Sequence, residues 1–225
     1  MDIIWQGLGE AFRLIFSGDS EIYEIVGLSL AVSSISVVLA SLLGIPAGAL
    51  LGTHEFPGKG LLVRLIYALM SLPPVIAGLV VFLVLMRRGP LGSLQLNFTP
   101  TAMVIAQVCL VTPIVVGLTY NIVREKAPSV RQLGLTLGAG RLRRLTLLIS
   151  EMRVGIAAAV VSGFGRAISE VGAVMIVGGN IKGQTRVMTT YIAELKGMGN
   201  YERAMAIGVI LLILSFVVNG ILYTF

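Results

Sequence analysis

Long apolar runs separated by short polar stretches dominate the hydrophobic pattern of this chain. The runs cover residues 25–51, 61–86, 101–123, 145–177 and 204–222. A helix of about 20 apolar residues crosses the ~30 Å hydrocarbon core of a bilayer, so each run is long enough to span it. The pattern predicts an all-α integral membrane protein with five transmembrane helices.

Residues 1–20 show a different pattern, that of an amphipathic helix. One face carries Ile4, Trp5, Leu8, Phe12, Ile15 and Phe16, and the other carries Asp2, Gln6, Glu10 and Arg13. The segment is too short to cross the membrane at ~1.5 Å per residue, so we predict an interfacial helix. Its acidic residues and the absence of an unbroken apolar core argue against a signal peptide.

Two of the apolar runs are irregular. The run 61–86 contains Pro73 and Pro74, which remove two backbone donors and bend a helix. Lipid tolerates this only where neighbouring helices cover the freed carbonyls, so the prolines indicate a structural kink or a helix that lines a pathway. The run 145–177 would be about 50 Å long as one helix. We predict that its first part, with Glu151 and Arg153, projects from the membrane.

Composition agrees with a membrane protein. Of 225 residues 56% are hydrophobic and only 12% are charged, and the mean hydropathy is +0.94. The net charge of +6 lies mostly in loops and helix ends, where it indicates membrane topology rather than nucleic-acid binding. The lone Cys109 offers no disulfide framework or Cys-rich metal site, and we predict no metal site.

Motifs of the common nucleotide-binding and hydrolytic sites do not occur in the sequence. It contains no G-x-x-x-x-G-K-[ST], H-E-x-x-H or G-x-S-x-G, and its single histidine, His54, stands alone in a short loop. Two classes remain as alternatives to the interpretation below. A secondary transporter would be expected to show repeated halves with interrupted helices, and a membrane-embedded enzyme would need a nucleophile-base pair or metal site.

The most basic segment, RQLGLTLGAGRLRR, runs from Arg131 to Arg144 between two predicted spans. With this segment inside, Lys and Arg are equally numerous on the two sides. Six of the seven inner ones nevertheless lie in the single loop 124–144. Dense positive charge beside a membrane resists translocation, so we place the loop in the cytoplasm. A Gly-rich, Arg-rich turn there predicts a docking surface for a partner outside the lipid.

This basic segment resembles the cytoplasmic signature of binding-protein-dependent ABC importer permeases, E-A-A, three residues, G, nine residues, I-x-L-P. Leu137, Gly138 and Ala139 fit its Leu-Gly-Ala core and register. The chain departs from the signature at Gln132 in place of Glu, at Leu133 and Gly134 in place of two alanines, and at residues 148–151.

Further segments resemble the oxyanion permeases of that family. SLPPVIAGLVVFLVLMRRGPLG, residues 71–92, is similar to the second-span signature of molybdate, tungstate and sulfate permeases. Residues 165–190 are similar to the R-A-x-x-E-x-G-A motif followed by a G-N-I-x-G loop. The FPGK sequence at 56–59 and the TRVMTT ending resemble the tungstate branch most closely. The resemblance covers residues 24–222.

The resemblance implies a type I ABC importer permease fold at residues 24–222, in the plasma or inner membrane. A second copy of the chain would complete the pore, two ABC ATPase subunits would bind ATP and Mg, and an extracytoplasmic oxyanion-binding protein would deliver the cargo. This chain itself would hold no cofactor and no catalytic residue. Tungstate is the expected cargo, with molybdate or sulfate as alternatives.

The resemblance also implies which residues couple the chain to the ATPase. In the family this segment forms a short helix across a groove of the ATPase, where small residues let the two backbones approach. The residues at these positions are Gln132, Leu133, Gly134, Leu137, Gly138, Ala139, Gly140, Arg141, Arg143 and Arg144. The three arginines could bind an acidic or carbonyl-rich rim of the partner.

Arg166 and Glu170 are charged residues within an apolar run. They are four residues apart, so they can pair on one helix face. An unpaired charge at mid-bilayer costs at least ~2.5 to 3.5 kcal/mol, which favours either a structural ion pair or a gate that exchanges partners. Direct contact of Glu170 with the anion is unfavourable because like charges repel. Together with Pro73, Pro74 and Gly172 they form the predicted pore or gate set.

A second predicted set, Thr185, Arg186, Thr189 and Thr190, lies in the polar segment before the last span. Hydroxyl groups give a dianion hydrogen bonds of moderate strength, which stabilise it without trapping it. We therefore predict contacts with cargo or with the binding protein at the outer mouth. The alternative for the threonines is capping and turn formation.

Overall fold

The structure is a computed structural model, and it describes residues 2–16 and 19–224. Nine α-helices and one 3-10 turn, and no strand, occur within these ranges. In chain order they are α1 Asp2–Phe16, α2 Ser20–Thr53, α3 Lys59–Met70, α4 Pro74–Leu85, η1 Gly92–Leu94, α5 Pro100–Thr136, α6 Arg141–Ile168, α7 Gly172–Gly178, α8 Met188–Gly197 and α9 Tyr201–Thr224. The all-α prediction is therefore confirmed.

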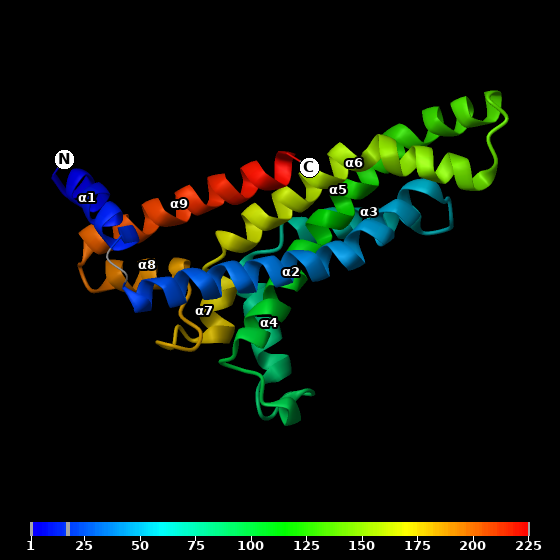
Figure 1. Ribbon diagram of the computed structural model, residues 1–225. Coiled ribbons are helices and arrows are strands. Elements are labelled where there is room, and N and C mark those ends of the chain that lie inside the picture. The colour runs from blue at the N-terminus through cyan, green and yellow to red at the C-terminus, as the bar shows by residue number, and fades with distance from the viewer. Residues whose placement is uncertain (1, 17–18, 225) are drawn as a thin grey trace.

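The centre of the bundle is the packing of α2 against α5 (Figure 1). Gly44, Gly48 and Gly52 repeat every fourth residue on the α2 face that meets α5. A Cβ at Gly48 would stand 2.6 Å from the carbonyl oxygen of Val116, so only glycine fits. Small residues at such spacing let two membrane helices approach closely, which compensates for the weak driving force between apolar surfaces in lipid.

Four segments are long and apolar enough to cross a membrane: α2, α5, Thr146–Ile168 of α6 and Tyr201–Ile221 of α9. The pair α3 and α4 passes the same test together, although a bend of 99° separates its two helices. The described residues therefore contain four spans, or five if the bent pair counts as one. This arrangement identifies a multi-pass membrane protein.

The run 61–86 differs from the single bent helix that the sequence suggests. Helix α3 ends at Met70, Pro73 has extended backbone angles, and α4 begins at Pro74. Proline disfavours helical angles in the residue before it and lacks a backbone N–H, so a tandem pair ends one helix and suits the first turn of the next. The two prolines thus separate two helices instead of bending one.

The run 145–177 is also interrupted. Helix α6 ends at Ile168, and α7 begins at Gly172 after a break at residues 169–171. The side chain of Glu170 accepts a hydrogen bond from the backbone N–H of Ala173 at 3.0 Å, which satisfies a free donor in the first turn of α7.

The predicted loop 124–144 is largely helical. Helix α5 continues through Pro128 to Thr136, and α6 begins at Arg141, so only residues 137–140 form a turn. The two helices extend as a hairpin beyond the ends of their neighbours at the upper right of Figure 1. The high charge of this segment led to the prediction of a loop, but charged side chains are compatible with a helix that water surrounds.

Helix α1 lies beside α9 (Figure 1). Gly7 packs against Met205, and Ala11 and Leu14 are buried in the same contact region. Trp5 and Phe12 are 72% and 62% exposed. The protein therefore buries Ala11 and Leu14 of α1 and leaves Trp5 and Phe12 exposed, and the interfacial location stays a prediction.

Candidate functional site

The turn at the end of the α5–α6 hairpin depends on a glycine. The N–H of Ala139 bonds to the carbonyl of Gly134 at 2.8 Å, and that of Gly138 bonds to Leu135 at 3.1 Å. Gly138 has φ +63°, in the left-handed region that favours glycine. This turn closes α5 and reverses the chain into α6.

The small residues of the hairpin have two different surroundings. A Cβ at Gly134 would stand 2.5 Å from Cγ of Arg144, so this glycine lets the arginine cross α5. Apart from their immediate chain neighbours, Gly138 and Gly140 have no described heavy atom within 4 Å of a Cβ position. Of the small residues predicted for close approach, Gly134 serves the hairpin itself, whereas Gly138 and Gly140 leave the outer surface open.

The outer surface of the hairpin is unusually apolar for a segment that projects from a bundle. Leu133, Leu135 and Leu137 are 58%, 56% and 70% exposed. Arg143 is exposed beside them, and Gln132 is exposed on α5. The side chain of Arg141 lies outside the described residues. Exposed leucines bordered by polar groups are typical of a surface that another protein covers.

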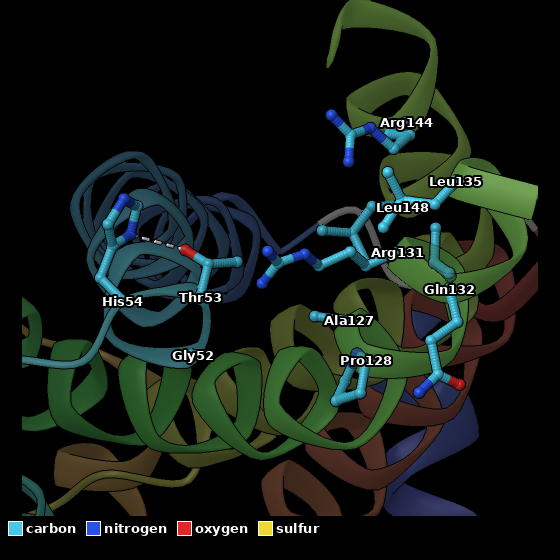
Figure 2. A pocket seen from close by; sticks show the side chains of 11 residues that line it. Gly52, Thr53, His54, Ala127, Pro128, Arg131, Gln132, Leu135, Arg144 and Leu148 are labelled. Atoms are coloured by element: carbon cyan, nitrogen blue, oxygen red, sulfur yellow. Dashed lines mark hydrogen bonds between the residues drawn. The ribbon is translucent and has the colours of Figure 1, made fainter. Parts of the chain in front are cut away.

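A groove of about 870 Å³ lies between the hairpin and the end of α2. Gly52, Thr53 and His54 form one wall, and residues of α5 and α6 form the other (Figure 2). Figure 2 shows Arg131 reaching toward the α2 wall, with Arg144 above it on the hairpin side of the groove. The groove therefore carries positive charge from two helices next to the apolar hairpin surface.

The predicted pore residues lie where the two helix breaks meet. A Cβ at Gly172 would be 3.0 Å from Cγ2 of Val75, which follows the tandem prolines. One turn further along, a Cβ at Gly78 would be 2.6 Å from the Cα of Ala173. The starts of α4 and α7 are thus in direct contact, and the structure brings Pro74 and Gly172 together. Sequence spacing gave no sign of this contact.

Glu170 connects three elements within this break. Its carboxylate is 3.5 Å from Nη2 of Arg166 on α6, and its Oε1 accepts the Ala173 N–H of α7. Its backbone carbonyl accepts the hydroxyl of Thr189 on α8 at 2.8 Å. Glu170 is 4% exposed, whereas about a third of the Arg166 side chain is exposed. The predicted ion pair is present, but Glu170 lies just beyond the end of α6.

Glu170 shares a small cavity with two buried polar residues, Gln107 and Ser29, which were not predicted as site residues. Nε2 of Gln107 donates to the carbonyl of Ala167 at 3.0 Å, and Oγ of Ser29 accepts the N–H of Met188 at 2.8 Å. These bonds satisfy backbone groups freed by the breaks before α7 and α8. A glutamine and a serine inside apolar runs were visible signals, since polar residues in a span need a partner.

The predicted outer-mouth threonines are buried, and their hydroxyls bond within the chain. Thr185 donates to the carbonyl of Gly178 at 2.5 Å, and Thr190 to that of Val187 at 3.0 Å. Thr189 makes the bond to Glu170 described above. These contacts fit the capping and turn alternative, and contact with cargo stays a prediction.

Arg186 takes part in an ion-pair network at the same end of the bundle. It lies 2.8 Å from a carboxylate oxygen of Glu194 and 3.5 Å from one of Glu21, and it stacks 5.1 Å from the centre of the Tyr191 ring. Lys182 pairs with Glu21 at 2.9 Å. The network links the start of α2 to α8 and to the loop before it. Glu21 and Glu194 were not predicted as site residues.

A metal centre has no support in the described part of the chain, where no three His, Cys, Asp or Glu side chains gather. The arrangement offers a docking surface, interrupted helices and charge interactions. It consists of an exposed basic hairpin, two facing helix breaks with a buried ion pair, and a charged network at the opposite end. These features belong to a multi-pass membrane protein with an exposed surface on which another protein could dock.

The chain belongs to the family of binding-protein-dependent transport system inner membrane components, whose profile matches residues 44–225. It is 48% identical to the tungstate uptake system permease protein TupB of Peptoclostridium acidaminophilum, over 100% of this chain and 98% of that protein. TupB of Campylobacter jejuni is 34% identical, over 98% of this chain and 92% of that protein. The molybdenum transport system permease protein ModB of Escherichia coli K12 is 30% identical, over 88% and 91%. The resemblance to ABC permeases of the oxyanion group is confirmed.

Proposed function

We propose that this chain is the permease subunit of an ATP-driven tungstate importer in the plasma or inner membrane. Its full-length similarity to tungstate permeases, at 48% and 34% identity, is the observation that carries the cargo assignment. Molybdate is the second candidate, because a molybdenum permease is 30% identical. Sulfate is the third, because a sulfate permease of Synechocystis is 29% identical.

The α5–α6 hairpin is the contact with the ATPase in this proposal. Its exposed leucines need a partner surface, and Gly138 and Gly140 leave room for a close approach. Gln132, Leu133, Leu137 and Ala139 lie on the same segment, and Arg143 adds positive charge. Two ATPase subunits, which bind ATP and Mg, would each hold one hairpin of a homodimer. Five spans in a type I importer fold, with α1 at the interface, complete the arrangement.

The facing helix breaks are the moving part of the pathway. When the ATPases close on ATP, the hairpins are displaced, and the displacement reaches the breaks through α5 and α6. The Arg166–Glu170 pair can be satisfied in more than one packing, since both partners are polar groups with several bonding positions. A gate at this level would therefore switch between two states without leaving a buried charge unpaired.

The opposite end of the bundle receives cargo from the extracytoplasmic binding protein. Arg186 and its carboxylate partners present a charged rim there, and Thr185, Thr189 and Thr190 hold the loop that carries Arg186. Charges at a rim steer association and fix its register more than they add affinity. The choice of anion would lie mainly in the binding protein.

The experiment that tests the proposal is uptake of tungstate into proteoliposomes that contain this chain, its ATPase and the loaded binding protein. We expect uptake to require ATP and to disappear with an ATPase variant that binds but does not hydrolyse it. Competition with molybdate and sulfate separates the three cargo candidates. Uptake without the ATPase would instead indicate a secondary transporter, and turnover of a product by the isolated chain would indicate an enzyme.

A further inference from the structure

The exposed surface of α3 has two lengthwise edges that differ in polarity. One edge is apolar and carries Leu61, Leu65 and Leu69, which are 75%, 53% and 37% exposed. The other carries exposed residues at intervals of four, three and four, so they form one line along the helix. These residues, called here the α3 stripe, are Gly60, Arg64, Tyr67 and Ser71.

The α3 stripe runs between two features already described. Its first end follows the loop from α2, where Lys59 is held over the ring of Tyr120 on α5. Its last residue, Ser71, is the C-cap that follows α3, at the break before Pro73 and Pro74. The stripe therefore leads from the hairpin end of the bundle to the place where α4 meets α7.

Arg64 is the residue of the stripe that lipid would tolerate least. Within the described residues Arg64 takes part in no ion pair with a carboxylate at 4.0 Å or less, and α3 is apolar enough to form part of a span with α4. A bare arginine in hydrocarbon costs ~2.5 to 3.5 kcal/mol on insertion scales. Asn121 of α5, also exposed, adds an amide to the same side. We infer that the stripe faces water, while the leucine edge faces lipid or a second copy of the chain.

The hydrogen-bond geometry beside Arg64 suits an anion. The hydroxyl of Tyr67 donates to Oδ1 of Asn121 at 2.5 Å, which fixes the amide and leaves its two N–H donors free to bond outward. Arg64 adds a permanent positive charge and a fork of N–H donors. One arginine with one amide stabilises an oxyanion, but a cluster of arginines would hold it too firmly for release.

We propose that Arg64 and Asn121 form a contact point for the tetrahedral oxyanion between the helix breaks and the hairpin end of the pathway. Tyr67 is a positioning residue that orients the Asn121 amide. The proposal rests on the proposed function for the identity of the cargo, but the solvent exposure and positive potential of the stripe do not depend on it. Two experiments separate these parts.

The first experiment maps the stripe with thiol reagents. Cys109 is the only cysteine in the sequence, so Cys109→Ala gives a cysteine-free background. In that background Ser71→Cys places a thiol on the stripe, and Leu65→Cys places a matched thiol on the leucine edge. In the purified complex we expect an anionic methanethiosulfonate to label the Ser71→Cys variant at least about tenfold faster than the Leu65→Cys variant, because charged reagents act from water.

The positive potential has its own readout in the same experiment. At low salt, adding Arg64→Gln should slow the anionic reagent at position 71 about twofold and leave a neutral reagent unchanged, because a nearby positive charge attracts only the anion. Equal labelling at positions 71 and 65 would overturn the water-facing stripe. An unchanged rate of the anionic reagent in Arg64→Gln would overturn the role of Arg64 as the attracting charge.

The second experiment measures transport. In proteoliposomes Arg64→Gln should lower tungstate uptake about tenfold, the size of one lost charged hydrogen bond, with Arg64→Lys in between. ATP hydrolysis stimulated by the loaded binding protein should stay within about twofold, because the hairpin is untouched. Arg88→Gln, which removes a charge from the loop after α4, is the control that keeps full uptake.

Wild-type uptake in Arg64→Gln, with labelling as expected, would show that the stripe is wet but carries no contact for the anion, and would overturn the proposal. Absence of tungstate uptake by the wild-type complex would instead count against the proposed function. In that case the labelling rates still decide whether the stripe faces water and attracts anions.

Discussion

Replacing Gly138 with aspartate tests whether the hairpin is the coupling contact. Gly138 lies at the tip, at φ +63°, and apart from its chain neighbours no described heavy atom lies within 4 Å of its Cβ position. A side chain there meets open space and points to where the partner would approach. We expect Gly138→Asp to abolish ATP-driven uptake while the spans remain inserted.

The expected free-energy changes distinguish a loss of docking from a loss of folding. A left-handed residue other than glycine costs about 1 to 2 kcal/mol, and least for Asn and Asp, against ~5 to 15 kcal/mol of total stability for a folded domain. The substitution therefore leaves the chain folded. Burying an unpaired carboxylate in the contact costs several kcal/mol, and about 3 kcal/mol already lowers occupancy more than a hundredfold.

Gly138→Asn is the matched control, because it has the same strain and nearly the same size but no charge. Co-purification with the ATPase and tungstate uptake are measured for both variants, normalised to the amount of inserted chain. Aspartate should remove uptake, and asparagine should retain a substantial part. Undiminished uptake with aspartate would refute the coupling role. Equal loss with both residues would trace the effect to size or backbone strain and would refute the electrostatic part of the argument.

Three further predictions concern the described contacts. Glu170→Gln keeps an acceptor for the first turn of α7 and loses only the ion pair, whereas Glu170→Ala loses both. The glutamine variant of the purified chain should therefore be about 1 kcal/mol more stable than the alanine variant. Equal melting temperatures of the two variants would contradict the capping role. Gly48→Leu should prevent a monodisperse protein on size-exclusion chromatography, whereas Gly27→Leu, at a position with nothing within 4 Å, should not. Lys59→Met should lower the free energy of unfolding by about 1 to 2 kcal/mol, because this buried ammonium bonds to His54 and Glu55 in the α2–α3 loop. Lys182→Met, which removes an exposed ion pair with Glu21, should change it by less than ~1 kcal/mol. Thermal unfolding in detergent measures both, and equal shifts would show that burial of Lys59 contributes nothing.

The long apolar helices and the position of the basic segment could be predicted from the sequence because hydrophobic runs and charge density are local signals, but the predicted loop 124–144 is a helical hairpin. The apolar runs correspond to helices, and the turn at 137–140 lies inside the predicted coupling segment. Pro73 and Pro74 signalled an irregularity for the same local reason. Their effect on direction was not predictable, because the 99° bend depends on how α4 packs against α7.

Other features depend on residues that are distant in sequence. The contact of Gly172 with Val75 joins two breaks about one hundred residues apart. The burial of Thr185 and Thr190 follows from the packing of α8 and its preceding loop, so their residue types alone suggested a surface role. The structural role of Gln107 was not predicted, because a single polar residue barely changes the hydropathy of a long span. Pairing across elements, rather than composition, decides what these residues do.

The glycine series on α2 has a consequence for how motion travels through the molecule. Gly44, Gly48 and Gly52 seat α2 flush against α5, where side chains cannot slide past one another without a clash. The two helices are therefore expected to move together, and α5 alone, with 37 residues, is about 55 Å long at 1.5 Å per residue. A small push at the hairpin would swing the far end of α2, with Glu21 and its two cationic partners, through a matching arc. A displacement at one membrane surface would in this way be transmitted to residues at the other.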